Sequence, residues 1–219
     1  MHIAEGLLPP AHALAWTAAA VPFVAAGARH VSRVVRTTPA GVTQLGATAG
    51  FVLVLSSLKL PSVAGSSSHP TGVGLGVVLC GPGMLAPLTA IVLVFQALLL
   101  GHGGLTTLGA NVWAMGVAGP WAMWAVRAAA DRLGRRPLIG LWLGTFAGVL
   151  ATYLTTAGQL ALAYAPMAGG VWPAFVGFAA VFGITQLPLA IGEATLTMWA
   201  VRTLGVAPVD TLTAREAGA

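Results

Sequence analysis

Long apolar stretches recur along the whole chain, separated by short polar segments or by segments rich in glycine and proline. They lie at residues 8–28, 40–58, 71–82, 83–100, 105–126, 138–164 and 171–201. A stretch of about 18 or more apolar residues can cross a hydrocarbon core about 30 Å thick as a helix. The sequence does not show the alternation of apolar and polar residues that is typical of membrane β-barrel strands. The pattern therefore predicts an all-α bundle of transmembrane helices.

The basic residues predict how these helices cross the membrane. They cluster after three of the apolar stretches, as Arg29, Arg33 and Arg36, then Arg127, Arg132, Arg135 and Arg136, and finally Arg202. Loops rich in basic residues stay on the cytoplasmic side. An even number of crossings then separates the first two clusters, so 71–82 and 83–100 count as two passes, although 71–82 spans only about 18 Å as a helix. The sequence predicts about seven spans with the amino terminus outside.

No soluble module interrupts the apolar stretches. We expect residues 1–205 to form a single transmembrane domain, followed by a short cytoplasmic tail at 206–219. Loop 59–72, which is crowded with glycine, serine and proline, lies outside in this topology. The loop brings His69 to the same face of the membrane as the amino terminus.

Composition agrees with a multi-pass protein of the inner or plasma membrane, in contact with the lipid bilayer. Hydrophobic residues make up 57% of the chain and charged residues only 7%, whereas roughly a quarter of the residues of a soluble protein are charged. The net charge of +5 reflects topology and does not indicate nucleic-acid binding. The single cysteine, Cys80, excludes an intramolecular disulfide and CxxC metal sites.

The first two residues form a candidate metal chelate. The α-amine of Met1, the deprotonated amide nitrogen of His2 and its ring nitrogen can close two fused rings around one divalent cation, and His69 can supply a fourth nitrogen. Four nitrogens in a plane suit Ni(II) or Cu(II), and Co(II) is possible with a small change in geometry or an axial ligand. We expect the chain to keep Met1, because removal of the initiator requires a small second side chain. Residues 1–12 also lack the basic n-region of a signal peptide.

Other polar residues near this site admit two interpretations each. A group of hydroxyl residues can orient His69 or serve as ordinary turn and cap residues, namely Ser66, Ser67, Ser68 and Thr71. His102, in the sequence GHGG, falls on the outer side and can approach the site, although loop capping is the favoured interpretation. His12 is expected at the outer end of the first span, and His30 in the cytoplasmic flank.

Ionisable and amide residues inside the apolar stretches call for partners. A carboxylate such as Glu193 is costly within a membrane and raises a functional hypothesis by default. The amides of Gln96, Asn111, Gln159 and Gln186 are expected to form interhelical hydrogen bonds. The only lysine, Lys59, follows Leu58, which excludes a P-loop, and the hydrolase motifs HExxH and GxSxG are absent. Any energy from ATP must then come from a partner, and the chain is not expected to be an enzyme.

Four blocks of the sequence carry a resemblance to a known family. They read MHIAEGLLPP, SSLKLPSVAGSSSHPTGVGLG, ALLLGHGGLTTLGAN and TQLPLAIGEATLT. Together they resemble the substrate-binding membrane component of energy-coupling-factor cobalt and nickel transporters, the CbiM/NikM family. The resemblance implies seven spans and a metal held by the amine of Met1, the backbone and ring nitrogens of His2 and the ring of His69. The chain departs from the family at Val149, where an acid is usual, and at Trp113–Met115, where FSM is usual.

The resemblance also implies a function and a set of partners. The chain would be the metal-capturing subunit of an ATP-driven importer for cobalt that supplies cobalamin synthesis, with Co(II) or Ni(II) as substrate and no intrinsic cofactor. Its partners would be a transmembrane coupling protein, two cytoplasmic ATPase subunits and a small accessory membrane subunit. Nickel uptake by the same type of subunit and a stand-alone metal permease are the alternatives.

Overall fold

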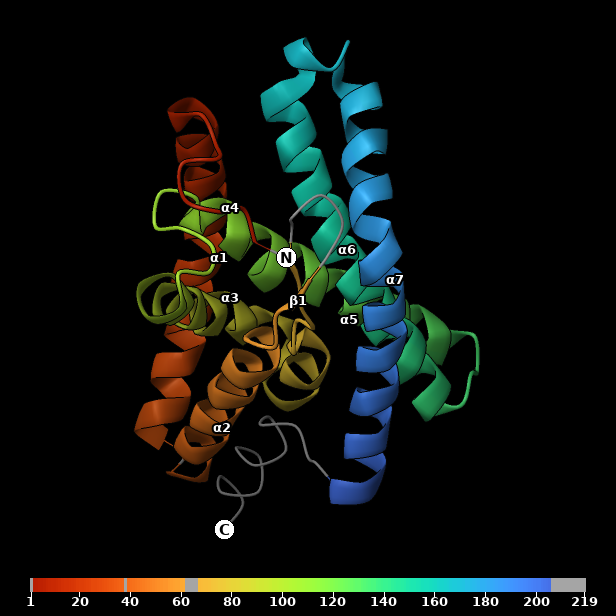
Figure 1. The fold of residues 1–219 in the computed structure, drawn as a ribbon. Coiled ribbons are helices and arrows are strands. Elements are labelled where there is room, and N and C mark those ends of the chain that lie inside the picture. The colour runs from red at the N-terminus through yellow and green to blue at the C-terminus, as the bar shows by residue number, and fades with distance from the viewer. Residues whose placement is uncertain (1, 38, 62–66, 206–219) are drawn as a thin grey trace.

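The computed structural model describes residues 2–37, 39–61 and 67–205, and these form an almost entirely helical protein (Figure 1). The elements in chain order are α1 (Pro10–Thr37), α2 (Pro39–Ser56), β1 (Leu60–Pro61), β2 (Ser67–Ser68), α3 (Val73–Leu100), α4 (Leu108–Val112), the π-helix η2 (Trp113–Ala118), α5 (Gly119–Arg132), α6 (Pro137–Tyr164), the 3-10 helix η3 (Ala165–Met167) and α7 (Val171–Leu204). The two short strands pair antiparallel, with Leu60 opposite Ser68. The predicted all-α fold is confirmed.

Five of the described helices are long and apolar enough to cross a membrane, which confirms a multi-pass membrane protein. They are α1, α2, α3, α6 with the short helix that follows it, and α7. The predicted fifth span corresponds to α4, η2 and α5, which follow one another without a break. Helix α1 continues nine residues past the predicted end at residue 28, to Thr37, because a helix can extend beyond the membrane when its polar residues meet water.

The two passes predicted at 71–82 and 83–100 correspond to two helical segments that meet at a sharp kink within α3. The kink lies at Gly81, whose backbone is not helical (φ 73°, ψ 164°). Only glycine adopts this conformation readily, and Pro82 adds a residue that lacks an N–H donor. The predicted count of seven spans is therefore approximate.

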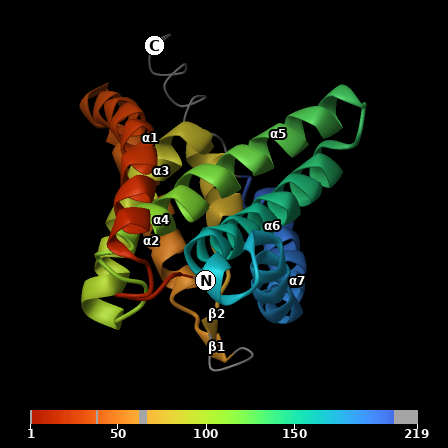
Figure 2. The same ribbon diagram turned by 90° about the horizontal axis from the view of Figure 1, so that it is seen from above.

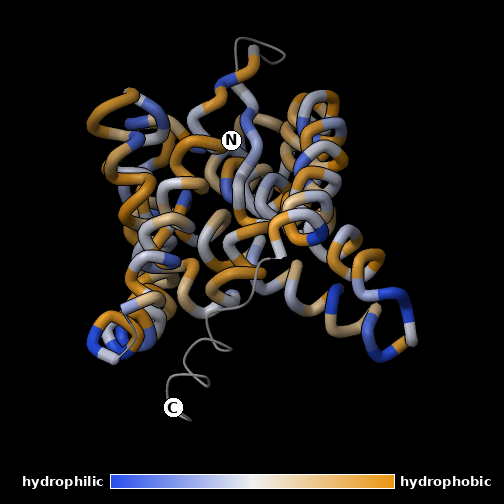
Figure 3. Tube along the Cα trace, turned by 90° about the horizontal axis from the view of Figure 1, so that it is seen from below, coloured by the Kyte–Doolittle hydropathy of each residue, from blue (hydrophilic) through white to orange (hydrophobic). Residues whose placement is uncertain are grey.

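The hydrophilic ends of the molecule gather on one side. In Figure 3 the turn from α1 to α2 lies at the lower left and the loop from α5 to α6 at the lower right, both away from the end marked N. Figure 2 shows the β1–β2 pair at the same end of the molecule as the amino terminus. The connections beside the first two arginine clusters thus lie toward one side, as the sequence predicts. Which side faces the cytoplasm stays a prediction.

Helix α3 lies at the centre of the bundle, and small residues allow its neighbours to approach closely. It packs against α1, α2, η2 and α5, while α6 packs between α5 and α7. Leu85, Val92 and Met115 belong to its buried apolar core. Val149 is 1% exposed on α6 and so serves helix packing.

We expect Gly109→Ala to destabilise the protein, because Gly109 is where α4 meets α1. A Cβ at this position would overlap the backbone and the hydroxyl of Thr17. Overpacking of this kind costs about 1–3 kcal/mol of unfolding free energy, which thermal unfolding in detergent will measure. The matched control is Gly158→Ala on α6, where an added Cβ meets nothing within 4 Å. Equal stability of the two variants would contradict the close contact.

Candidate metal centre

The backbone next to His2 is held by hydrogen bonds to two side chains, Thr107 just before α4 and Asn111 within it. The backbone N–H of Ile3 donates to Asn111 Oδ1 at 2.8 Å, and its carbonyl accepts from Asn111 Nδ2 at 3.0 Å. The Thr107 hydroxyl donates to the same carbonyl at 2.7 Å. Ile3 is 2% exposed, so these bonds are shielded from water. The Asn111 amide pairs with both the N–H and the carbonyl of Ile3, as the backbone of a neighbouring β-strand does. It therefore fixes the backbone next to His2.

The GHGG loop between α3 and α4 packs directly on this segment. Gly101 ends α3 in the left-handed conformation (φ 56°), and Gly103 is also left-handed (φ 79°). A Cβ on Gly104 would lie 2.5 Å from the Cα of Glu5, so only glycine allows the two backbones to come this close. Glu5 in turn accepts a hydrogen bond from the backbone N–H of Thr106 at 3.2 Å. The glycines of this loop are therefore a packing requirement.

His69 lies at the start of the short connection between β2 and α3, and its ring is oriented locally. Its Nδ1 contacts the carbonyl of Pro70 at 2.8 Å. A carbonyl can only accept, so Nδ1 carries the proton and Nε2 is the nitrogen with a lone pair. This orientation of the ring is the one that a metal-binding histidine commonly has.

The residues that follow His69 are anchored by Glu193 of α7. Its carboxylate accepts from the backbone N–H of Thr71 at 2.5 Å, from the Thr71 hydroxyl at 2.7 Å and from the backbone N–H of Gly74 at 3.4 Å. These donors belong to the start of α3, where unpaired N–H groups favour a negative charge. The partner that the sequence requires for Glu193 is therefore the amino-terminal end of a helix.

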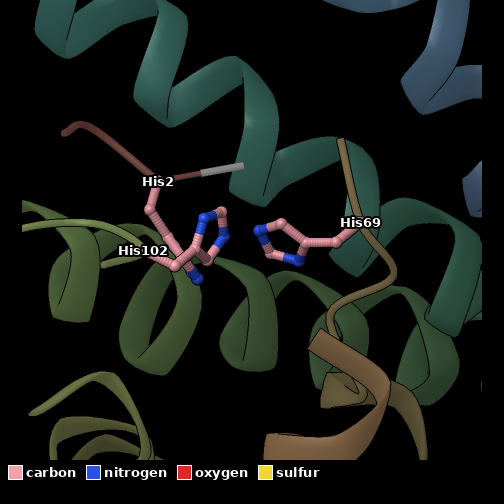
Figure 4. Close-up of side chains that lie close together, drawn as sticks. All are labelled: His2, His69 and His102. Atoms are coloured by element: carbon pink, nitrogen blue, oxygen red, sulfur yellow. The ribbon is translucent and has the colours of Figure 1, made fainter. Parts of the chain in front are cut away.

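Three imidazole rings from separate loops converge at one place (Figure 4). The ring centroids of His2 and His69 are 4.5 Å apart, and His102 lies 4.7 Å from His2 and 4.8 Å from His69. One ring nitrogen from each residue lies within 4.8 Å of the others. His69 is 0% exposed and His102 is 6% exposed. The geometry lets all three rings reach a single cation.

Burial keeps these imidazoles in the form that binds metals. It lowers the pKa of His2 well below its usual range, an effect to which the charge of His69 adds. Burial also lowers the pKa of His69 well below its usual range, and it lowers the pKa of His102 to about 4. A neutral imidazole has a lone pair to donate, whereas a protonated one does not. The three rings are therefore neutral at pH 7.

The residues expected near the site have different positions. Met1 and Ser66 lie outside the described residues, and Ser67 is placed only by its backbone in β2. The Ser68 hydroxyl shares a hydrogen bond with that of Thr185 at 2.7 Å. The loop capping favoured for His102 is supplied instead by Gly101 and by the backbone of His102, whose N–H donates to the Gln96 carbonyl at 3.0 Å. The His102 side chain joins the cluster.

The amides of the apolar stretches fill several roles. Gln96 donates to the Ser56 hydroxyl at 2.7 Å and Gln159 to the Ala110 carbonyl at 3.0 Å, which confirms two interhelical bonds. Asn111 instead bonds Ile3, which lies outside any helix. Gln186 Nε2 is buried without a hydrogen-bond partner among the described residues. The sequence marked Asn111 as polar and buried but could not identify Ile3 as its partner.

Comparison with known proteins identifies relatives along nearly the whole chain. A family model described as the cobalt uptake substrate-specific transmembrane region, CbiM, matches residues 2–210. The cobalt transport protein CbiM of Streptomyces coelicolor is 50% identical over 93% of this chain and 88% of its own length. That of Thermosediminibacter oceani is 49% identical over 90% of this chain and 81% of its own.

Solved structures share the fold. A transition metal transporter superposes with a TM-score of 0.81 and 25% identity over 94% of this chain and 92% of its own. A truncated transition metal transporter gives a TM-score of 0.79 and 25% identity over 93% of this chain and 98% of its own. The helical arrangement described above is therefore also the arrangement of known metal transporters.

Proposed function

The chain belongs to the CbiM family of cobalt transport membrane proteins, and we propose that it captures its cation at the cluster of His2 and His69. The proposed donors are the amine of Met1, the backbone and ring nitrogens of His2, and the ring of His69. The cation is substrate and not a resident cofactor. Co(II) is the proposed ion, because the family model and the relatives are described by cobalt.

One observation carries this proposal. His2 and His69 come from segments far apart in the chain, yet their ring centroids lie 4.5 Å apart, and His69 is fully buried. Two buried side chains support the pair by hydrogen bonds to the backbone. Asn111 holds the residue beside His2, and Glu193 holds the residues after His69. Bringing two imidazoles together without an ion between them has no evident benefit for stability, whereas a preformed site lowers the cost of binding.

The energy for uptake would come from partner subunits. The sequence has no P-loop, since its only lysine is Lys59 and the residue before it is leucine. We propose a transmembrane coupling protein, two cytoplasmic ATPase subunits and a small accessory membrane subunit as partners. Hydrolysis in the ATPases would reorient this chain and expose the site to the cytoplasm, where the cobalt supplies cobalamin synthesis. The chain itself performs no catalytic step in this scheme.

Metal content and competition between Co(II) and Ni(II) test the proposed site. The protein is purified with its native amino terminus, alongside His69→Ala and the matched control His12→Ala, which removes a histidine of α1 from outside the cluster. We expect about one ion per chain in the native protein and the control, and loss of the ion in His69→Ala, because this change removes one of the four proposed nitrogen donors. Absence of metal from all three proteins would contradict the proposal.

The competition also decides between cobalt and nickel uptake. Four nitrogens in a plane suit Ni(II), so nickel is the second candidate substrate for the same donors. Cobalt uptake by cells that lack the ATPase partners separates a coupled subunit from a stand-alone permease. A coupled subunit loses most uptake without them, whereas a permease keeps it.

A further inference from the structure

The side chain of His102 is buried beside the proposed site, and the backbone turn at this position does not depend on it. The backbone turn at this position is completed by Gly101 and by the bond from the His102 N–H to the Gln96 carbonyl. His102 Nε2 is buried and has no hydrogen-bond partner among the described residues, and the same holds for His2 Nε2. A buried polar nitrogen without a partner costs about 1–3 kcal/mol. Such a cost is expected where a ligand supplies the missing partner.

The orientation of His102 differs from that of the two histidines beside it. Its ring plane lies at 60° to that of His2 and at 79° to that of His69, whereas those two planes are 44° apart. Its centroid is nonetheless within 4.8 Å of both. The His102 ring thus lies against both of the other rings at a different tilt, and the three side chains lie together in Figure 4.

We propose that His102 is a further nitrogen donor to the captured cation, an inference that rests on the proposed function of this cluster. The donors from Met1, His2 and His69 would supply four nitrogens in one plane. His102 would add a fifth from outside that plane.

A fifth donor affects which ion the site prefers. Affinity of a nitrogen site normally rises from Co(II) to Ni(II), so selectivity for cobalt must come from geometry. Four planar nitrogens alone suit Ni(II), while Co(II) gains from an axial ligand. The His102 ring is therefore the group in this cluster that shifts preference from Ni(II) toward Co(II).

X-ray absorption at the cobalt edge counts the imidazoles on bound Co(II) in the native protein. We expect three, from His2, His69 and His102. The variant His102→Phe, which keeps a ring of similar size, should show two, and its affinity for Co(II) relative to Ni(II) should fall at least about tenfold. His12→Phe is the matched control and should behave as the native protein does.

The possible outcomes separate this inference from the function on which it rests. Two imidazoles on Co(II) in the native protein would overturn the role of His102 and leave the capture site standing. No bound cobalt in the native protein would overturn the proposed function itself. The native count needs no variant, so the inference stays testable even where His102→Phe fails to fold, and thermal unfolding of both variants will identify that case.

Discussion

A three-residue insertion between Met1 and His2 should abolish tight metal binding without unfolding the protein. Asn111 and Thr107 hold the backbone at Ile3, which lies after the insertion, so His2 keeps its place and only the amine moves away. The fused rings that join the amine, the amide and the imidazole can then no longer close. We expect the affinity for Co(II) to fall by more than about 100-fold, beyond the usual effect of changing a group that only supports a ligand.

The design of the insertion matters. A single added residue would leave two amides between the amine and the histidine, and that arrangement still chelates Ni(II) and Cu(II). The first inserted residue must be bulky, such as glutamine, so that the initiator methionine is retained. Competition with a chelator of known affinity measures the change. The same three residues added after residue 219 provide the control, and unchanged affinity in the first variant would show that the amine is not a donor.

Replacing Glu193 with alanine should weaken both the fold and the site. The change leaves three donors without an acceptor, namely the backbone N–H and hydroxyl of Thr71 and the backbone N–H of Gly74. Each buried donor left unpaired costs about 1–3 kcal/mol, so we expect a loss of about 3 kcal/mol or more in unfolding free energy. His69 lies two residues before Thr71, and its looser position should reduce metal affinity by roughly 10–100-fold.

Thermal unfolding and metal titration on the same samples measure these two effects. Glu193→Gln keeps one acceptor oxygen and should fall between the native protein and Glu193→Ala. The control is Thr203→Ala on the same helix, because that hydroxyl is exposed and bonds only the carbonyl of Trp199 in its own helix, at 2.8 Å. If Glu193→Ala unfolds and binds metal as the control does, the carboxylate does not anchor the loop.

The positions of most helices follow from local sequence. The predicted stretch 138–164 corresponds to helix α6 (Pro137–Tyr164), and the stretch 171–201 corresponds to helix α7 (Val171–Leu204). Prolines and glycines mark these boundaries, and they act on the backbone of their own neighbours. The geometry of the kink in α3 could not be predicted from the sequence. A glycine and a proline together predict a break, but they do not determine whether the next helix turns back or continues at an angle. The predicted passes 71–82 and 83–100 depended on that distinction.

The sequence by itself determined the membrane class, the helical fold and the pairing of Met1 and His2 with His69 as candidate donors. These conclusions rest on composition, on the length of apolar stretches, on the chemistry of Met1 and His2 and, for His69, on the predicted topology and the resemblance to a known family. The tertiary structure decided that His102 belongs to the cluster and that Asn111 and Glu193 support it. The bonds from Ile3 to Asn111 and from Thr71 to Glu193 join residues 108 and 122 positions apart. Such contacts depend on how whole helices pack, and no local pattern of residues specifies them.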